Sequence, residues 1–527
     1  MKKQHMILIV VLLTQFSISA FAQAPLIQWQ RSMGGTLAEF ARHVMQTTDG
    51  GYITIGYSES TDGDVTGNLG SYDFWVTRQD SLGNLLWQKC LGGSATEAAY
   101  SNEQTSDGGN LIAGDTRSND SDVTGNHGGR DFWIVQIDTA GNIQWQKCLG
   151  GSQDDYGTAA KQTSDGGYIL GGFSYSNDGD VTGHHGPSTR SDMWIAKLDS
   201  ARNITWQKSL GGSESEYANS IIMTNDGGYI AAGQTNSSDG DVTGFHGGTG
   251  TDYWVVKLDS MGNIQWQKCY GGTASDIASD IKQTNDGGYV VAGQSRSNNG
   301  DVTGLHFWED YWVVKIDSLG NIQWQKCLGG SFYDYAYSIQ QTVDGGYVVA
   351  GNTDSNDGDV TGNHGTSDCW IVKLDSTGNI QWQKCYGGTS TDAAYCVQQT
   401  GDLGYVIAGS SGSSDGDATL NQGFGDYWIV KLYPDFPSLT PGTELFSDLI
   451  IFPNPATNQL AVRSMKEAIE KIDIYNVLGE RIFNKQLSTS SLELQTIDVS
   501  QLTTGIYFVK VFIGEKSFCK KLFVEHE

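Results

Sequence analysis

Short runs of β-branched and aromatic residues, separated by turns rich in Gly, Asp and Asn, recur along most of the chain. In one copy, segments 338–342 and 347–351 flank an Asp-Gly pair, a strong short signal for a β-hairpin because both turn positions favour positive φ. Segments 310–316 and 322–327 flank a stretch in which Gly320 falls where a three-residue hairpin needs a left-handed residue. A loop of about 16 residues joins the two hairpins. The pattern predicts units of four antiparallel strands.

Two tryptophan positions mark seven copies of this unit at intervals of 58–61 residues. A period of about 60 residues suits one four-stranded blade, so the repeat number predicts a seven-bladed β-propeller in an all-β protein. The two series are Trp29, Trp87, Trp145, Trp206, Trp266, Trp324 and Trp382, and Trp75, Trp133, Trp194, Trp254, Trp312, Trp370 and Trp428.

The ends of the repeat array predict how the ring closes. Residues 27–33 match a fourth strand with no strands of its own blade before it, whereas residues 428–432 match a third strand with no fourth strand after it. The N-terminal strand can therefore complete the seventh blade and remove two open sheet edges. A linear solenoid would leave the orphan strand unexplained.

The composition divides the chain into four parts. Residues 1–22 have a charged start, an apolar centre and a small-x-small end, which predict a secretory signal peptide. The propeller is expected over residues 23–433, a linker with three prolines over 434–444, and a second domain over 445–527. No other stretch has the length of a spanning helix, so we expect no transmembrane segment.

The predicted propeller is strongly acidic. Residues 23–444 hold 21 basic and 50 acidic residues, a formal charge of about −29. Such a surface disfavours nucleic acid and anionic lipid, and it suits cations, basic partners or simple solubility. We expect a monomer with no nucleic-acid partner.

The C-terminal part alternates β-rich runs with turns, which predicts a β-sandwich of about 80 residues. Its motifs include Phe-Pro-Asn-Pro-Ala, Lys-Ile-Asp-Ile-Tyr-Asn-Val-Leu-Gly, Leu-Thr-Thr-Gly-Ile-Tyr-Phe-Val-Lys and Lys-Lys-Leu-Phe-Val. In order and spacing they resemble the type A C-terminal sorting domain of the type IX secretion system. The resemblance implies Sec export, passage through the outer membrane by that machinery, and release or attachment at the cell surface. The matching motif residues are Pro453, Asn454, Pro455, Gly505, Tyr507, Lys520 and Lys521.

The repeats resemble the propeller repeats of bacterial surface proteins, in their Asp-aromatic-Trp, Gly-Asn-Ile-Gln-Trp-Gln-Lys, Gly-Gly-Ser and Asp-Gly-Gly-Tyr segments. That resemblance implies the fold and says little about activity. Because neighbouring strands are antiparallel, all the long loops are expected on one face of the ring.

Each long loop carries an Asp-Gly-Asp motif or a close variant. Carboxylates two apart can offer oxygens to Ca²⁺, although the full calcium loop with its distal Glu is absent and Asp-Gly is also ordinary turn chemistry. No cofactor is required by the sequence, and Ca²⁺ is the candidate. The clearest pairs are Asp178 and Asp180, and Asp357 and Asp359.

Five histidines share one loop position, five residues after the second Asp of that motif: His127, His185, His246, His306 and His364. A ring of imidazoles could bind a transition metal only if the loops converged, because equivalent positions in a propeller are separated by a blade width. Packing within the repeat is the preferred interpretation.

Departures from the repeat indicate where a ligand would bind. Loop five loses its Gly-Gly and has the sequence His306-Phe307-Trp308-Glu309, and loop three is longer and contains His185 and Arg190. An exposed Trp beside polar groups favours a sugar or peptide contact. We therefore expect a binding or adhesion scaffold for an unknown glycan or protein ligand. The alternative is a secreted carbohydrate-active hydrolase or lyase, although the loops supply no Ser-His-Asp set or phosphate loop.

Five cysteines share one repeat position in different blades, and we expect them to be buried apolar residues. Cys369 departs from the repeat. If Asp375 pairs with Asn379, Cys369 lies directly opposite Cys385 on the adjacent strand, which predicts contact and allows a disulfide in an exported protein.

Overall fold

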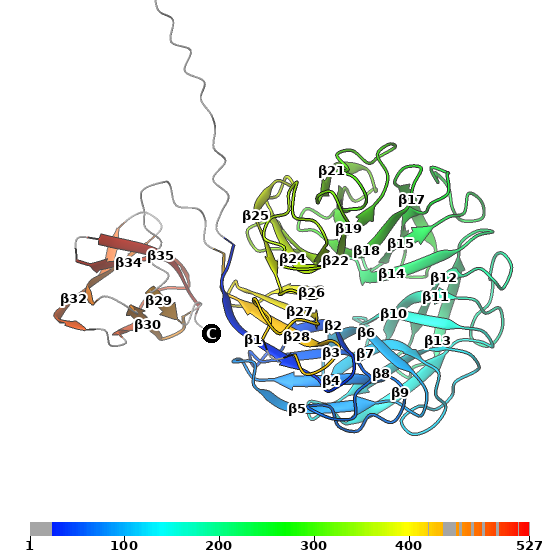
Figure 1. The fold of residues 1–527 in the computed structure, drawn as a ribbon, viewed down its shortest axis with the longest axis horizontal. Helices are drawn as coiled ribbons and strands as arrows, with labels where there is room; N and C mark the ends of the chain where they lie inside the picture. The colour runs from blue at the N-terminus through cyan, green and yellow to red at the C-terminus, as the bar shows by residue number, and fades with distance from the viewer. Residues whose placement is uncertain are drawn as a thin grey trace, which may run out of the picture. The chain divides into compact units, whose positions relative to one another are not determined.

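A computed structural model describes residues 24–419, 421–435, 449–452, 456–464, 468–476, 480–491, 495–514 and 516–525. The N-terminal part folds into seven four-stranded antiparallel sheets arranged in a ring (Figure 1). In each blade the first strand lies innermost and the fourth lies at the rim. The predicted seven-bladed β-propeller is therefore confirmed.

The strands of the blades, from the innermost outward, are as follows. Blade one has β2 (Glu39–Gln46), β3 (Tyr52–Ser58), β4 (Asp73–Gln79) and β5 (Leu85–Leu91); blade two has β6 (Glu97–Gln104), β7 (Asn110–Thr116), β8 (Asp131–Ile137) and β9 (Ile143–Leu149). Blade three has β10 (Asp155–Gln162), β11 (Tyr168–Ser174), β12 (Asp192–Leu198) and β13 (Ile204–Leu210); blade four has β14 (Glu216–Met223), β15 (Tyr229–Thr235), β16 (Asp252–Leu258) and β17 (Ile264–Tyr270). Blade five has β18 (Asp276–Gln283), β19 (Tyr289–Ser295), β20 (Asp310–Ile316) and β21 (Ile322–Leu328); blade six has β22 (Asp334–Gln341), β23 (Tyr347–Thr353), β24 (Asp368–Leu374) and β25 (Ile380–Tyr386). Blade seven has β26 (Asp392–Gln399), β27 (Tyr405–Ser411), β28 (Asp426–Leu432) and, at the rim, β1 (Ile27–Met33).

Closure by the N-terminal strand is confirmed. β1 pairs antiparallel with β28, with Gln30 opposite Val430. The indole Nε1 of Trp428 donates to Gln30 Oε1 at 2.8 Å, and the same bond joins Trp312 to Gln325 at 2.8 Å inside blade five. β1 therefore reproduces the side-chain contacts of a rim strand as well as its backbone pairing.

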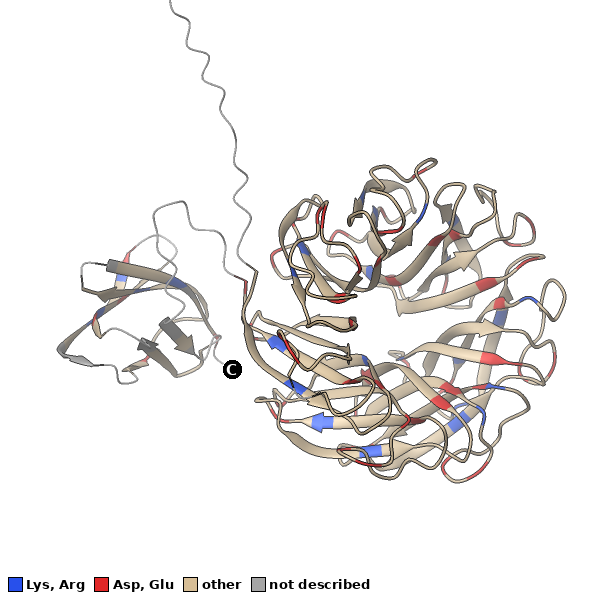
Figure 2. Ribbon diagram, in the orientation of Figure 1, with Lys and Arg blue, Asp and Glu red and all other residues tan. Residues whose placement is uncertain are grey.

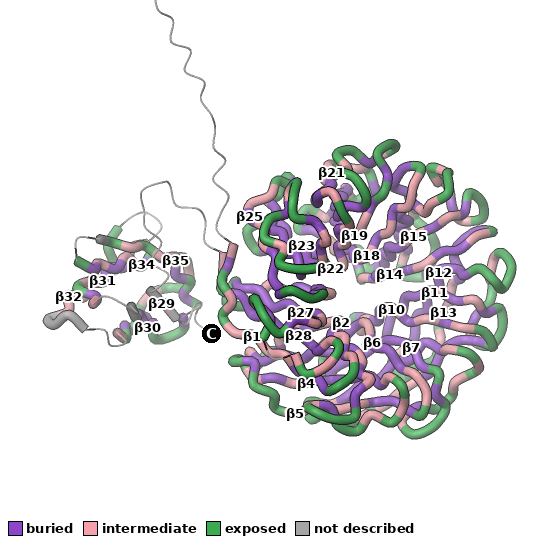
Figure 3. The backbone as a smooth tube through the Cα atoms, viewed as in Figure 1, coloured by how far each residue is buried: buried purple, intermediate pink, exposed green. Residues whose placement is uncertain are grey.

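Each joint between blades is packed by aromatic side chains. In six of the seven joints the rim-strand Trp of one blade meets a Tyr of the next blade's second strand, as Trp324 meets Tyr347 at a centroid distance of 5.6 Å; blade two has Asn110 at this Tyr position. The third-strand tryptophans are fully buried, and Tyr311 donates its hydroxyl hydrogen to the carbonyl of Trp370 in the next blade at 3.0 Å. The strands are buried along most of their length and the loops are exposed (Figure 3).

Every innermost strand contains a β-bulge after its third residue. In blade one the pairing moves from Ala41–Gly56 to His43–Ile55, so Arg42 has no opposite residue. The same irregularity recurs in the other six blades. A bulge leaves its extra residue outside the ladder and re-aims the side chain.

The predicted contact between Cys369 and Cys385 is wrong. The turn does pair Asp375 with Asn379, but a bulge between Lys373 and Leu374 shifts the register by one residue. Cys369 therefore lies opposite Tyr386, whereas Cys385 lies opposite Trp370. A one-residue shift moves a side chain to the other face of a sheet, and the two cysteines pack in different core clusters as free thiols.

Each blade joint also holds two buried carboxylates. The third strand of one blade and the innermost strand of the next both begin with an acidic residue, and Gly329 passes between such a pair, Asp310 and Asp334. Asp334 accepts hydrogen bonds from Gly330 N at 2.9 Å and Ser355 Oγ at 3.0 Å. One oxygen of the third-strand aspartate has no hydrogen-bond partner among the described residues. This holds for Oδ1 of Asp73, Asp131, Asp192, Asp252, Asp310, Asp368 and Asp426.

The C-terminal part forms a separate unit of two antiparallel sheets. One sheet contains β29 (Leu449–Phe452), β30 (Gln459–Ser464) and β33 (Gln495–Asp498); the other contains β31 (Ile469–Asn476), β32 (Arg481–Ser491), β34 (Gly505–Ile513) and β35 (Lys516–Val524). They enclose one apolar core that includes Leu460, Ile472 and Val509. Two sheets around a shared core agree with the predicted β-sandwich.

The predicted signal peptide at residues 1–22 and most of the predicted linker at 434–444 lie outside the described residues. The part of the chain that the structure describes contains no helix long and apolar enough to cross a membrane.

We expect removal of β1 to destabilise the ring strongly. A chain that begins at Thr36 lacks the strand that pairs with β28 and the partner of the Trp428 indole. It should melt well below a control chain that begins at Ala24, because a sheet edge and an aromatic joint are opened. Equal melting temperatures in differential scanning calorimetry would contradict this closure.

We expect the propeller to be more stable at pH 5 than at pH 7.5. Burial, with the neighbouring carboxylate, raises the pKa of Asp334 to about 7, and those of Asp73 and Asp252 to about 6. An unfolded aspartate titrates near pH 3.9, so between about pH 4 and 7 the folded chain holds protons that the unfolded chain has released. Stability therefore falls as pH rises through that window. Melting should occur about 2 °C or more higher at pH 5.

The variant Asp310→Asn tests the origin of this pH effect. Its amide can donate to Asp334 without taking up a proton, so the difference between the melting temperatures at pH 5 and 7.5 should shrink. Glu214→Gln, which removes an exposed carboxylate paired with Arg190, is the matched control. If both variants change the difference in melting temperature equally, the carboxylate pairs do not cause the pH effect.

Candidate functional site

The Asp-Gly-Asp loops tie the long loops to the connections between blades. Asp357 Oδ1 accepts a hydrogen bond from Ser331 N at 2.7 Å, and Asp359 N donates to Gly329 O at 2.8 Å. Gly358 has a φ of 65°, and a Cβ there would lie 2.4 Å from Gly329 O, so glycine is favoured between the two aspartates; Ser121 takes this place in loop two with a φ of 55°. Asp178 makes the same bond to Ser152 N at 2.7 Å, and Asp180 N donates to Gly150 O at 2.8 Å.

These contacts determine what the loops could offer to Ca²⁺. The first aspartate is committed to a backbone amide, and Oδ2 of the second accepts from a glycine N–H at 3.4 Å, as Asp359 does from Gly329 and Asp180 does from Gly150. Among the described residues no group of three or more acidic, His or Cys side chains is placed to hold a metal ion. Calcium binding at Asp178, Asp180, Asp357 and Asp359 stays a prediction.

Four of the five loop histidines bridge neighbouring blades, whereas the described ion pairs of His364 include only Asp368 of its own blade. His306 Nδ1 lies 2.7 Å from Asp310 Oδ2 in its own blade, and Nε2 lies 3.9 Å from Asp359 Oδ2 in the next. His185 repeats this arrangement with Asp192 at 2.7 Å and Asp241 at 3.8 Å. Burial opposes the charged form of His306, but the hydrogen bond and charge of Asp310 outweigh it and raise the pKa. Each imidazole is thus held by carboxylates at its own joint.

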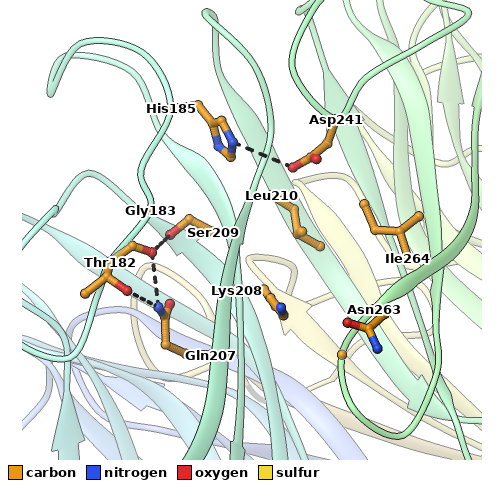
Figure 4. Close-up of a pocket in the computed structure, with 11 residues that line it drawn as sticks. Thr182, Gly183, His185, Gln207, Lys208, Ser209, Leu210, Asp241, Asn263 and Ile264 are labelled. Carbon is orange, nitrogen blue, oxygen red and sulfur yellow. Dashed lines mark hydrogen bonds and ion pairs between the residues drawn. The ribbon is translucent and has the colours of Figure 1, made fainter.

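A polar groove of about 510 Å³ lies between blades three and four (Figure 4). His185 and Asp241 face each other across it, and Gln207 bonds to Thr182. The same Gln–Thr bond joins Gln325 to Thr303 in blade five. The groove is therefore made largely from contacts that the repeat uses elsewhere, and it does not by itself mark a unique site.

Loop five presents the half-exposed tryptophan that the sequence indicates. Trp308 is 49% exposed and stacks on Tyr333, with centroids 5.9 Å apart and an interplanar angle of 27°. Tyr333 stacks in turn on Tyr335 at 6.0 Å and 4°. Buried beside them, Glu309 accepts a hydrogen bond from Arg296 Nε at 2.7 Å. The result is a row of three stacked aromatic rings, the platform, next to the Arg296–Glu309 ion pair.

The sequence-predicted ligand residues fall into two separate places. Trp308 and Glu309 belong to the platform on blades five and six, whereas Arg190 pairs with Glu214 at 2.8 Å on blades three and four. His306 and His185 each contact carboxylates of two neighbouring blades. No contact joins the two sets within the described residues.

The sequence analysis missed the aromatic residues that continue from the platform toward the ring axis. Tyr337 follows Tyr335 by two residues on β22 and meets Tyr395 of blade seven at 5.2 Å. The guanidinium of Arg42 in blade one lies 4.1 Å from the ring of Tyr395. We name the set Trp308, Tyr333, Tyr335, Tyr337, Tyr395 and Arg42 the aromatic band. For Arg42, Tyr337 and Tyr395 the available signal is that their shared repeat position differs from blade to blade, which forms no local motif.

Acidic residues occur in every blade, mostly in loops and at strand starts, while basic residues are fewer (Figure 2). The aromatic band therefore combines an arginine with tyrosine hydroxyls in a predominantly negative protein.

Comparison with known proteins identifies the tail. Residues 450–525 match the family described as the secretion system C-terminal sorting domain. Within this domain Gly505 and Tyr507 lie on β34, and Lys520 and Lys521 lie on β35. Tyr507 donates its hydroxyl hydrogen to Thr503 O at 2.7 Å. Pro453, Asn454 and Pro455 lie outside the described residues.

A curated relative is the regulatory protein FlaEY of Caulobacter vibrioides, 23% identical over 418 residues. The match covers 74% of this chain and 39% of FlaEY, so the chain spans less than half the length of that relative.

Solved structures similar to this chain include puromycin hydrolase and the WD40 domain of Pan2 from Neurospora crassa. The first is 11% identical with a TM-score of 0.44, over 84% of this chain and 62% of the hydrolase. The second is 12% identical with a TM-score of 0.39, over 79% of this chain and 97% of the Pan2 domain. From its own sheet topology and its tail, the chain is a seven-bladed β-propeller protein that carries a type IX secretion system C-terminal sorting domain.

Proposed function

We propose that this protein is a binding module, exported by the type IX system, that takes a glycan on the aromatic band. The observation that carries the proposal is the platform of Trp308, Tyr333 and Tyr335 beside the Arg296–Glu309 pair. Aromatic faces offer apolar contact to the C–H faces of a sugar ring, and fixed polar groups nearby orient its hydroxyls.

The exposed aromatic surface around Trp308 supports this proposal. Phe307 is 68% exposed and meets Trp308 edge-on at 5.7 Å, and Phe332, directly before Tyr333, is 53% exposed. Exposed apolar groups gathered in one place indicate an interaction site, whereas single exposed apolar residues are ordinary.

Residues that make the same contact in several blades are structural, whereas a residue found in one blade can serve a ligand. The Asp-Gly-Asp aspartates and the loop histidines are committed to joints in several blades. Trp308 occurs once and makes no contact that another blade repeats at its position. It is therefore available for a ligand.

We expect Trp308→Ala to weaken binding of a glycan identified on an array by about tenfold or more, because a stacking surface is lost. Phe424→Ala removes another exposed aromatic on the long-loop face and is the matched control. Titration calorimetry of the mature chain measures both. The proposed site is contradicted if the two variants bind equally well.

If a protein, but no glycan, binds through Trp308, the ligand class is wrong. Mass spectrometry of the glycan after incubation would detect cleavage and support the hydrolase alternative.

Deleting residues 445–527 should leave a folded propeller inside the periplasm of the native host, since the sorting domain directs passage across the outer membrane. Cell fractionation with an antibody to the propeller measures this, and a full-length chain in the same strain is the control. Arrival of the truncated chain at the cell surface or in the medium would contradict a sorting role for this domain.

A further inference from the structure

The innermost strands hold the side chains that vary most between blades. The bulged position, which is Arg42 in blade one, is occupied in order by Arg42, Tyr100, Thr158, Asn219, Ser279, Tyr337 and Tyr395. Residues that serve the joints must repeat, because the joints are alike. Positions free of that requirement can serve a ligand.

Arg42 stands without a counter-ion among aromatic rings. Its guanidinium lies 4.1 Å from the ring of Tyr395 and 5.4 Å from that of Tyr57, and its Nη2 donates to Tyr57 OH at 2.7 Å. Its Nε is buried with no hydrogen-bond partner, and Arg42 forms no ion pair with any described carboxylate. A largely desolvated guanidinium with unsatisfied donors favours an anionic partner.

The inner strands carry most of their acidic residues at the first position, which belongs to the joint. Beyond that position the seven strands contain Arg42, Lys161 and Lys282 against Glu103 and Asp280, in a chain with a formal charge of −28. This part of the inner strands is therefore close to neutral rather than acidic.

The two inner carboxylates are already engaged. Asp280 accepts from Lys282 Nζ at 2.6 Å, Ser220 Oγ at 3.0 Å and Ile339 N at 3.1 Å. Glu103 Oε2 accepts from the backbone N–H of Gln162 at 2.6 Å.

Lys161 makes no hydrogen bond or close ion pair with any described residue, but it feels the charge of Glu103, and burial lowers the pKa of its ammonium group. It lies near the axis with His43, whose pKa is lowered to about 3 by burial and by the charges of Lys161 and Lys282. His43 is thus neutral, and the positive charge comes from Arg42 and the lysines.

We propose that the glycan bound by the aromatic band is acidic, with a carboxylate or sulfate group paired with the Arg42 guanidinium at the inner end of the band. This inference rests on the proposed function. Neutral faces of the saccharide would stack on Trp308 and the tyrosines, and the anion would satisfy the donors that the protein leaves unpaired. A charge-assisted bond of this kind also discriminates strongly against a neutral ligand of the same shape.

The test compares acidic saccharides with neutralised partners of the same length on the mature full-length chain. One pair is oligogalacturonate and its methyl ester; the other is a chondroitin sulfate oligosaccharide and its desulfated form. We expect one acidic member to bind about tenfold or more tighter than its neutral partner. Sodium sulfate should compete only at far higher concentration, because it cannot use the stacking surface.

Three variants assign the preference to residues. Arg42→Met keeps the length of the side chain within its aromatic cage and should bring the ratio of acidic to neutral affinity to about one. Trp308→Ala should weaken both forms and keep that ratio. Arg42→Gln also removes the charge, and its amide can still donate to Tyr57, so it remains informative if Arg42→Met does not fold. Arg117→Gln, an exposed arginine paired with Asp154, controls for net charge.

The possible outcomes separate the two proposals. Equal affinity for the acidic and neutral partners, or a preference that survives loss of the Arg42 charge, overturns the acidic class and leaves glycan binding in place. Binding of no saccharide of either kind overturns both. Sulfate binding at Arg42 with no saccharide binding would also overturn both, because the site would then take free anions.

Discussion

The packing of aromatic side chains between neighbouring blades is the constraint on which the rest of this structure depends. A four-stranded sheet buries both faces only if a like sheet lies on each side, and here the rim-strand Trp and the second-strand Tyr make that contact in most joints. The turn glycine of the next blade also packs on this indole, since a Cβ at Gly378 would lie 2.9 Å from Trp324. Seven like joints close only when Trp29 on β1 meets Tyr52 of blade one, which it does at 5.3 Å.

Most of the polar and charged residues that recur in every blade make contacts that hold the blades together. The Asp-Gly-Asp carboxylates accept backbone hydrogen bonds, most of the loop histidines bridge carboxylates, and the strand-start acids lie buried in pairs. Buried like charges with an unpaired oxygen cost stability, and protonation relieves that cost. The residues that look most catalytic by type are therefore the ones that hold the ring together. The proposed binding of a glycan rests instead on residues that occur once, such as Trp308 and Arg42.

Several features of the candidate site could be predicted from the sequence. Trp308 interrupts two regular tryptophan series, and its half-exposed, stacked position agrees with that signal. His185 and Arg190 also stood out by their unusual loop, yet they contact different partners on another pair of blades. Arg42 escaped notice because a single bulged residue on an inner strand leaves no local pattern. Arg42 is identified as part of the band by its contact with Tyr395, which is 353 positions away in the sequence.

The sequence by itself determined the number of blades, the four strands of each blade, the closure by the first strand and the presence of the sorting domain. These features repeat or follow a family motif, so each is encoded many times or in one contiguous segment. Tertiary structure alone decided the register at Cys369 and Cys385, because a one-residue bulge reverses which face a side chain takes. It alone brought Trp308, Tyr337, Tyr395 and Arg42 into one band, because ring closure places the first and last blades side by side.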